Sequence, residues 1–236
     1  MLEIRSVITH QLLKQRLAHV ERRIREAETR FGRSPGSVQL LPASKTRPVA
    51  DIVQLASAGY RAFGESYLQE ALDKQKALTE LSLAWHFIGP IQSNKTRPIA
   101  RYFDWVHSVD REKIARRLSA QRPRDLLPLN VCLQVNISGE AAKSGIGLDA
   151  LPMLAAGVNA LPGLRLRGLM AIPAREDDFE RQRAAFHCLR EAFDHLNADG
   201  LALDTLSMGM SGDLEAAIAE GATLVRVGSD IFGMRK

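Results

Sequence analysis

The sequence predicts an α/β fold, a single (β/α)8 barrel preceded by one extra helix. Short apolar runs alternate with amphipathic stretches through the chain, a pattern typical of parallel strands joined by crossover helices. There are eight such runs, and 236 residues are close to the length that one closed barrel requires. An open doubly wound sheet is the alternative, but no Gly-x-Gly-x-x-Gly follows the first run. We therefore expect residues 1–236 to form one domain.

The first element is a helix expected over residues 8–31 and ended by Gly32 and Pro35. An apolar stripe at helical spacing runs along it: Leu13, Leu17, Val20 and Ile24. Residues 1–33 hold eight Lys or Arg against four Glu, which is most of the net charge of +5. A basic helix can bind nucleic acid, but the stripe requires a core to cover it. We therefore expect this helix to pack on the barrel, with no nucleic-acid partner.

The strands and helices that follow are placed by apolar runs and by helical periodicity. Strands are expected at Val38–Ala43, Arg61–Gly64, Ala84–Ile88, Trp105–Val109, Asn130–Asn136, Leu164–Ala171, Asp204–Met208 and Leu224–Val227. Helices are expected to begin near Val49, Ser66, Ser93, Arg111, Asp149, Glu176 and Gly212. The segments 45–50 and 95–100 share a Lys-Thr-Arg-Pro pattern, which we interpret as the same helix start used twice.

Composition excludes several other classes of protein. No apolar run approaches the ~18 residues of a membrane span, and residues 1–33 lack the apolar core of a signal peptide, so we expect a cytoplasmic protein without a membrane partner. Cys132 and Cys188 are too few for a disulfide framework, and we expect both to be reduced and buried. The six histidines show no metal-ligand spacing, so no metal is expected.

Lys45 is the first candidate for chemistry. Active sites of such barrels lie at the carboxyl ends of the strands, and Lys45 directly follows the first run. Desolvation there lowers the pKa of an ammonium group and allows the amine to attack a carbonyl, as a Schiff base requires. A salt bridge in an ordinary loop is the alternative interpretation. Lys95 is less well placed, because it follows its strand by several residues.

The loops after the seventh and eighth strands are rich in small and hydroxylated residues. Ser211 precedes a predicted helix, and Gly228 and Ser229 follow the last strand. Backbone amides at such positions bind anions, and these two loops bind phosphate in many barrels. Tight turns and a helix cap are the alternative roles for these residues.

Arg226 completes the candidate site. If Val225 and Val227 face the surrounding helices, strand alternation turns Arg226 inward, where its guanidinium needs a partner. A structural carboxylate or the nitrogen of a heteroaromatic ring would satisfy it. An amine, an anion site and an inward arginine together fit pyridoxal 5'-phosphate (PLP). His86, near the end of a predicted strand, is a further candidate for the pocket wall, with a core histidine as the alternative.

Several motifs, taken together, resemble the pyridoxal phosphate homeostasis protein family, single-domain relatives of the alanine racemase N-terminal barrel. The matching stretches run in order from Leu40 to Gly233: Ser44–Thr46, Trp85–Lys95, Gln134–Ser138, Lys143–Gly145, Arg167–Ile172, Ser207–Ser211 and Val225–Gly233. One departure is Ser66, where the family usually has asparagine after Gly-Glu. Any contact made by that longer amide is expected to be lost.

The resemblance implies roles for several residues. It implies an internal aldimine between PLP and Lys45, and phosphate contacts from Ser211 and from the turn Gly228–Ser229. Arg226 would face the ring nitrogen, and Met170 would line the pocket. Lys143 matches a family lysine that is a possible accessory to cofactor arrival or release.

The expected function is cofactor handling rather than robust catalysis. An arginine at the ring nitrogen keeps it unprotonated, which weakens the ring as an electron sink. The protein would hold PLP reversibly, take part in intracellular vitamin B6 homeostasis and supply apoenzymes transiently. The first alternative is a PLP-dependent amino-acid racemase or related enzyme of low activity, which would need a second acid or base. The second is an interaction scaffold without cofactor. A monomer is the expected state, because no long apolar stripe is left exposed.

Overall fold

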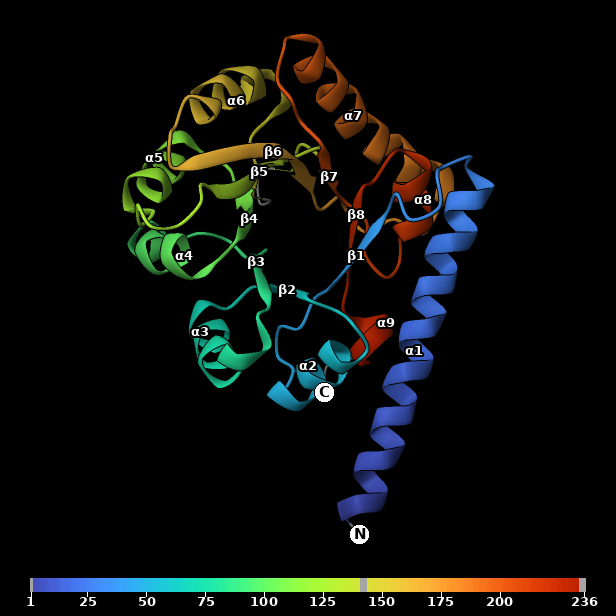
Figure 1. The fold of residues 1–236 in the computed structure, drawn as a ribbon. Coiled ribbons are helices and arrows are strands. Elements are labelled where there is room, and N and C mark those ends of the chain that lie inside the picture. Colours follow the sequence, from blue (N-terminus) through green and yellow to red (C-terminus); the bar gives the residue numbers. More distant parts are fainter. Residues whose placement is uncertain (1, 141–143, 234–236) are drawn as a thin grey trace.

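Eight parallel strands form a nearly closed barrel surrounded by helices (Figure 1). The structure is a computed structural model that describes residues 2–140 and 144–233. The strands are β1 (Gln39–Pro42), β2 (Ala62–Glu65), β3 (Ala84–Phe87), β4 (Trp105–Val109), β5 (Leu129–Val135), β6 (Leu164–Ala171), β7 (Thr205–Ser207) and β8 (Leu224–Val227). All eight predicted strands are confirmed, with ends shifted by at most a residue or two.

The strands follow one another around the barrel in chain order, and β1 pairs with β8. The remaining seam, between β1 and β2, is joined by the bridge Ala43–Gly64 and by a hydrogen bond from Ser44 N to Gly64 O of 2.9 Å. The (β/α)8 barrel that the sequence predicts is therefore confirmed. The doubly wound alternative is wrong, because its strands would not return to the first one.

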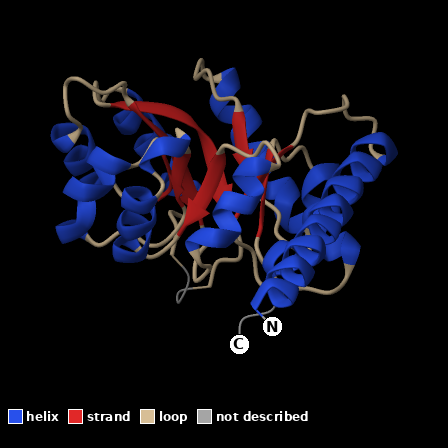
Figure 2. Cartoon of the chain, turned by 60° about the horizontal axis from the view of Figure 1, so that its bottom comes forward, coloured by secondary structure: helices blue, strands red, loops and turns tan. Residues whose placement is uncertain are grey.

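Helices cover the outside of the barrel (Figure 2). They are α1 (Leu2–Arg30), α2 (Val49–Ser57), α3 (Leu68–Ala77), α4 (Thr96–Tyr102), α5 (Glu112–Gln121), α6 (Leu151–Asn159), α7 (Phe179–Ala198), α8 (Leu214–Ala219) and α9 (Ser229–Phe232). Short 3-10 turns lie at Thr79–Leu81, Ser93–Lys95 and Leu148–Ala150. The seven helix starts predicted after the first strand hold to within three residues, whereas α1 begins at Leu2, six residues before its predicted start, and the four-residue α9 was not predicted.

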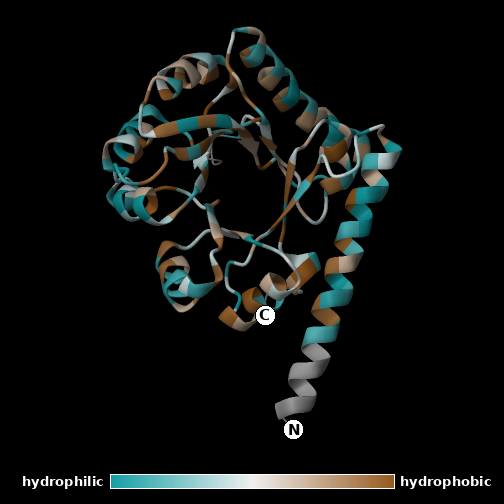
Figure 3. Ribbon diagram, viewed as in Figure 1, coloured by the Kyte–Doolittle hydropathy of each residue, from teal (hydrophilic) through white to brown (hydrophobic). Residues whose placement is uncertain are grey.

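The additional helix α1 packs against α8 and α9, beside the last strands of the barrel (Figure 1). Its predicted stripe is buried, since Leu13, Leu17, Val20 and Ile24 are at most 7% exposed. The alternation of polar and apolar turns along α1 is visible in Figure 3. The stripe therefore serves the core, as the spacing predicts.

The two cysteines lie in different environments, one buried and one exposed. Cys132 is buried, and burial raises the pKa of its thiol to about 12. Cys188 is exposed, so the expectation of burial is wrong for it: α7 turns Phe186 and Leu189 inward and leaves Cys188 on another face. Among the helices of the described residues, none combines the length and apolar character that a membrane crossing needs.

The pairing of neighbouring strands, together with the alternation of side chains along each strand, determines which side chains point into the barrel. Arg226 on β8 pairs with Leu41 on β1, and two residues further along that strand Ala43 pairs with Gly64 on β2. Alternate residues of each strand face the same side, so Val225 and Val227 point outward and Arg226 points inward. The prediction that Arg226 faces the interior is confirmed, since this side chain is 4% exposed and lines an internal cavity.

Candidate functional site

A cavity of about 330 Å³ opens at the carboxyl ends of the strands, within the size range of small-molecule pockets. It is lined by Ala43, Lys45, Arg47, Ile88, Ile172, Met210, Ser211, Gly212, Arg226, Gly228, Ser229 and Gly233. The predicted residues Lys45, Ser211, Arg226, Gly228 and Ser229 thus share one wall. Residues of β8 and of the segments that follow β1, β3, β6, β7 and β8 meet here because parallel strands all end at one face.

Serine hydroxyls and backbone amides lie close together on the side of the cavity formed by the loops after β7 and β8. Ser229 Oγ donates to Ser211 Oγ at 2.9 Å, and the amide of Asp230 reaches the same oxygen at 3.3 Å. Ser229 is the first residue of α9, a position whose N–H has no intrahelical acceptor. A Cβ atom on Gly228 would lie 3.3 Å from the carbonyl oxygen of Ala43, so glycine lets the two backbones approach closely. These groups suit a small anion.

Arg23 on α1 holds these two loops together from outside the barrel. Its guanidinium donates to Ser211 O at 3.0 Å, to both carboxylate oxygens of Glu215 at 2.7 and 2.8 Å, and to Asp230 at 2.5 Å. The hydrogen bond to Glu215 raises the pKa of Arg23, so the cation is retained. Two carboxylates that would repel an anion are thereby neutralised. No sequence pattern indicates this role, because the partners of Arg23 lie nearly two hundred positions along the chain.

Arg226 is held in the floor of the cavity by neutral oxygens. Its Nη1 donates to Ser207 O at 2.5 Å and to Ser207 Oγ at 2.8 Å, and its Nη2 donates to Ala171 O at 2.9 Å. Burial lowers the pKa of Arg226 to about 10, which leaves it charged at neutral pH. Among the described residues, these three hydrogen bonds engage Nη1 and Nη2 of a group that carries five N–H donors in all.

Behind Arg226, a chain of hydrogen bonds crosses the barrel. Ser207 Oγ lies 2.7 Å from His107 Nδ1, and His107 Nε2 lies 2.9 Å from His86 Nδ1. Burial lowers the pKa of His86 to about 3 and that of His107 well below its ordinary value, so both rings are neutral. Since Arg226 donates to Ser207, the serine proton is available to His107, which then donates to His86. This assignment fixes one tautomer for each ring.

The structure corrects the expected position of His86. It lines a second cavity, at the amino ends of the strands, and stacks on Trp105 with ring centroids 5.4 Å apart. Met170 is likewise fully buried and lies outside the cavity wall. On both strands the wall is formed instead by the residue two positions further on, Ile88 and Ile172. Each predicted residue therefore sits one inward-facing layer too deep.

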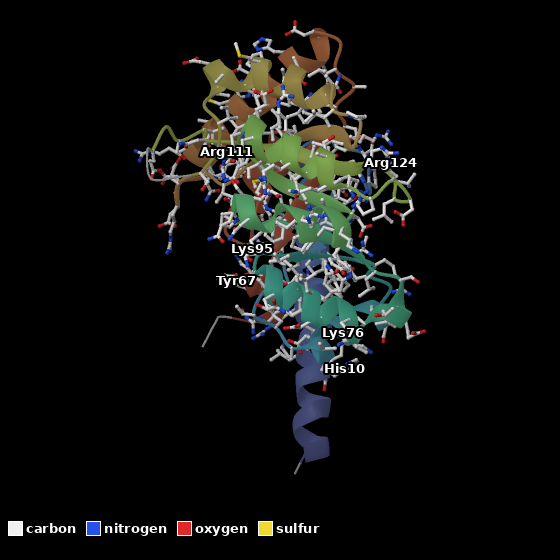
Figure 4. The ribbon with its side chains drawn as sticks, turned by 90° about the vertical axis from the view of Figure 1, so that its left-hand side faces the viewer. His10, Tyr67, Lys76, Lys95, Arg111 and Arg124 are labelled. Carbon is white, nitrogen blue, oxygen red and sulfur yellow. The ribbon has the colours of Figure 1, made fainter. Side chains whose placement is uncertain are left out.

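Other candidates take different positions. Lys143 lies outside the described residues. Lys95 ends a 3-10 turn and is exposed, and Figure 4 shows it with Tyr67 and Arg111 at one end of the barrel, opposite Lys76 and Arg124. Tyr67 follows β2 closely and so lies at a strand end, which its sequence context did not indicate. No group of three or more His, Cys, Asp or Glu side chains within residues 2–140 and 144–233 could hold a metal ion.

Arg47 is a wall residue that the sequence analysis did not select. The repeated Lys-Thr-Arg-Pro pattern was interpreted only as a helix start, and Pro48 and Pro98 do lie at the starts of α2 and α4. The Arg47 guanidinium donates to Gly233 O and lies 5.8 Å from the ring centroid of Phe232. It therefore adds a second guanidinium to the cavity wall.

Comparison with known proteins places this chain among related barrels. The family profile described as "Alanine racemase, N-terminal domain" matches residues 16–236. The pyridoxal phosphate homeostasis protein of Pseudomonas aeruginosa is 61% identical, covering 94% of this chain and 96% of that protein. The protein of that name from Escherichia coli is 53% identical, covering 93% and 95%. PipY of Synechococcus elongatus, solved with PLP bound, has a TM-score of 0.82 and 37% identity, covering 94% of this chain and 100% of that one.

The two buried histidines predict a pH dependence of stability. In the unfolded chain each binds a proton below about pH 6.5, whereas in the folded barrel each stays neutral to far lower pH. The unfolded state therefore binds more protons, and stability falls as pH falls, by up to ~1.4 kcal/mol per pH unit for each histidine. Urea unfolding between pH 6.5 and 4.5 should show a smaller slope for His107→Asn than for the wild type. The exposed His19→Asn is the control, and an unchanged slope in His107→Asn would contradict the assignment.

Proposed function

The chain belongs to the pyridoxal phosphate homeostasis protein family, and on that basis we propose that it binds PLP in the cavity at the barrel mouth. Holding the cofactor reversibly, it would take part in intracellular PLP homeostasis and in supply to apoenzymes. We also propose that residues 1–236 act as one domain, as a monomer in the cytoplasm.

The observation that carries this proposal is the set of donors in one cavity wall. PLP presents an aldehyde, a phosphate and a pyridine nitrogen. The wall offers a lysine amine at Lys45, two hydroxyls and backbone amides at Ser211 and Ser229, and the buried guanidinium of Arg226. The residues present therefore fit the cofactor, because each of its three chemical groups has a matching group in the cavity wall.

Each group of the protein has a separate task. Lys45 would supply the amine that binds the aldehyde of the cofactor, with loss of one water molecule. The hydroxyls of Ser211 and Ser229 and the amide of Ser229 bind the phosphate. Arg226 would orient the ring by donating a hydrogen bond to its nitrogen. Bound PLP supplies a reactive carbonyl and an electron-withdrawing ring.

Arg226 also favours storage of the cofactor over catalysis. A guanidinium only donates hydrogen bonds, so the ring nitrogen beside it must accept one and therefore carry no proton. An unprotonated ring withdraws electrons less strongly, which disfavours carbanion chemistry on a bound amino acid. This supports a protein without robust catalytic activity. Lys143, as an accessory in cofactor arrival or release, stays a prediction of the resemblance.

An amino-acid racemase is the second candidate, because the family shares the barrel of alanine racemase. Two-base racemisation needs a second acid or base facing the lysine. Among the tyrosines, Tyr67 lies at the mouth end but is 50% exposed and outside the cavity wall. Racemisation assays of the PLP-loaded protein with several amino acids should give only trace turnover. Turnover comparable to that of a dedicated racemase would replace the proposed function with this one.

Lys45 should carry the covalent link. Borohydride reduction of the PLP-loaded protein followed by peptide mapping should place the stable label on Lys45. Lys45→Ala should lose this label, because its side chain has no amine to form the C=N bond. The matched control is Lys95→Ala, which removes an exposed mouth lysine outside the cavity wall and should keep the label. Label spread over other lysines in the wild type would overturn the proposal.

Arg23 should affect only the phosphate end of the cofactor. Arg23→Gln removes the cation that neutralises Glu215 and Asp230, and PLP should bind about tenfold more weakly, as expected for the loss of a charge-assisted contact. Pyridoxal, which lacks the phosphate, should bind the variant and the wild type alike. Arg116→Gln, at an exposed pair on α5, is the control. Equal weakening of PLP and pyridoxal would show general damage to the barrel instead.

A further inference from the structure

A buried cluster of charges lies directly behind Lys45, and no role described above uses it. Lys74 on α3 is 4% exposed and Glu65 at the end of β2 is fully buried. The Nζ of Lys74 donates to Glu65 Oε1 at 2.8 Å and to Glu70 Oε1 at 2.5 Å. Charged side chains are rarely buried unless they are paired and hydrogen-bonded, so this position needs an explanation.

The cluster contacts both chain neighbours of Lys45. Lys74 Nζ donates to Ser44 O at 2.7 Å, and Ser44 Oγ donates to Glu65 Oε1 at 2.6 Å. On the other side, the backbone N–H of Thr46 donates to Glu70 Oε1 at 2.6 Å. Lys45 therefore lies between two residues that are both bonded by this cluster, which joins the end of β2 to α3.

Thr46 has an unusual backbone conformation, with φ at 65°. This left-handed region is unfavourable for a β-branched residue, and such strain persists only where surrounding contacts hold it. The turn occurs where β1 has ended and the chain leaves the barrel toward α2. Among the surrounding side chains, that of Glu70 is the one bonded to the strained amide.

We propose that Glu70, held by Lys74, is a positioning residue that keeps Thr46 in its left-handed turn and so directs Lys45 into the cavity. Glu70 is not among the residues that line the cavity. Its carboxylate is partly exposed, whereas Glu65 is the buried partner that secures Ser44. The inference rests on the proposed function, because it concerns how the lysine that binds PLP is presented.

The test compares the loss of Glu70 with and without the backbone strain at Thr46. Glu70→Ala removes the acceptor of the Thr46 amide, and the full-length variant should bind PLP through Lys45 about tenfold more weakly, a loss of ~1.4 kcal/mol. Thr46→Gly adopts a positive φ without strain. In the T46G background, E70A should therefore weaken binding less than threefold. Glu70→Gln keeps an acceptor oxygen and should lie between E70A and the wild type.

A second readout needs no cofactor. Hydrogen exchange of the Thr46 amide in the PLP-free protein should be at least tenfold faster in E70A than in the wild type, because its acceptor is lost. The matched control is Glu112→Ala, since Glu112 also lies in the first turn of its helix and pairs with a basic residue four positions on. This variant should change neither binding nor exchange at Thr46.

The outcomes separate the inference from the proposed function. Unchanged binding in E70A, or equal weakening with and without T46G, would overturn the positioning role. Unchanged exchange at Thr46 in E70A would overturn it as well. Failure of the wild-type protein to link PLP at Lys45 would defeat the proposed function, while the exchange experiment would still measure the hold of Glu70 on Thr46.

Discussion

The interior of this barrel is organised around one buried cation, the guanidinium of Arg226. Register on β8 turns it inward, and a buried charge requires hydrogen bonds in compensation. Ser207 and Ala171 accept its hydrogen bonds with neutral oxygens, and the carboxylate of Asp213 favours its charged form electrostatically. The guanidinium also lines the cavity, where we propose that it donates to a ligand. The hydrogen-bonded pair His107 and His86 then continues the chain behind Ser207 across the barrel.

The helices outside the strands hold the site from two sides. On one side, Arg23 on α1 joins the loops after β7 and β8 and neutralises the carboxylates beside them. On the other, Lys74 and Glu70 on α3 fix the chain around Lys45. On the side of the loops after β7 and β8, the cavity wall contains small residues, namely Ser211, Gly212, Gly228 and Ser229. The positions of these small residues therefore depend on charged side chains outside the cavity wall. Arg23 is one of them, and through it the additional helix α1 contributes to the site.

Sequence reasoning recovered what periodicity and topology determine. The eight strands follow from apolar runs, and Lys45 and Arg226 meet because parallel strands bring their ends to one face. The position of a residue along its strand was predicted less accurately. His86 faces the interior, as strand alternation predicts, but it lies one inward-facing layer below the cavity wall. Contacts such as those of Arg23 with Ser211 and Glu215 join residues nearly two hundred positions apart. No local pattern encodes them, since they exist only once α1 packs on α8 and α9.

The central claim is that Arg226 faces the ring nitrogen of bound PLP and leaves it without a proton. The most direct measurement is the ¹⁵N chemical shift of PLP labelled at the pyridine nitrogen and bound to the intact protein. The account predicts the shift of an unprotonated, hydrogen-bonded nitrogen at neutral pH, moving toward that of free PLP in Arg226→Gln. A protonated ring nitrogen in the wild-type complex would contradict the assignment of Arg226 and the argument against strong carbanion chemistry.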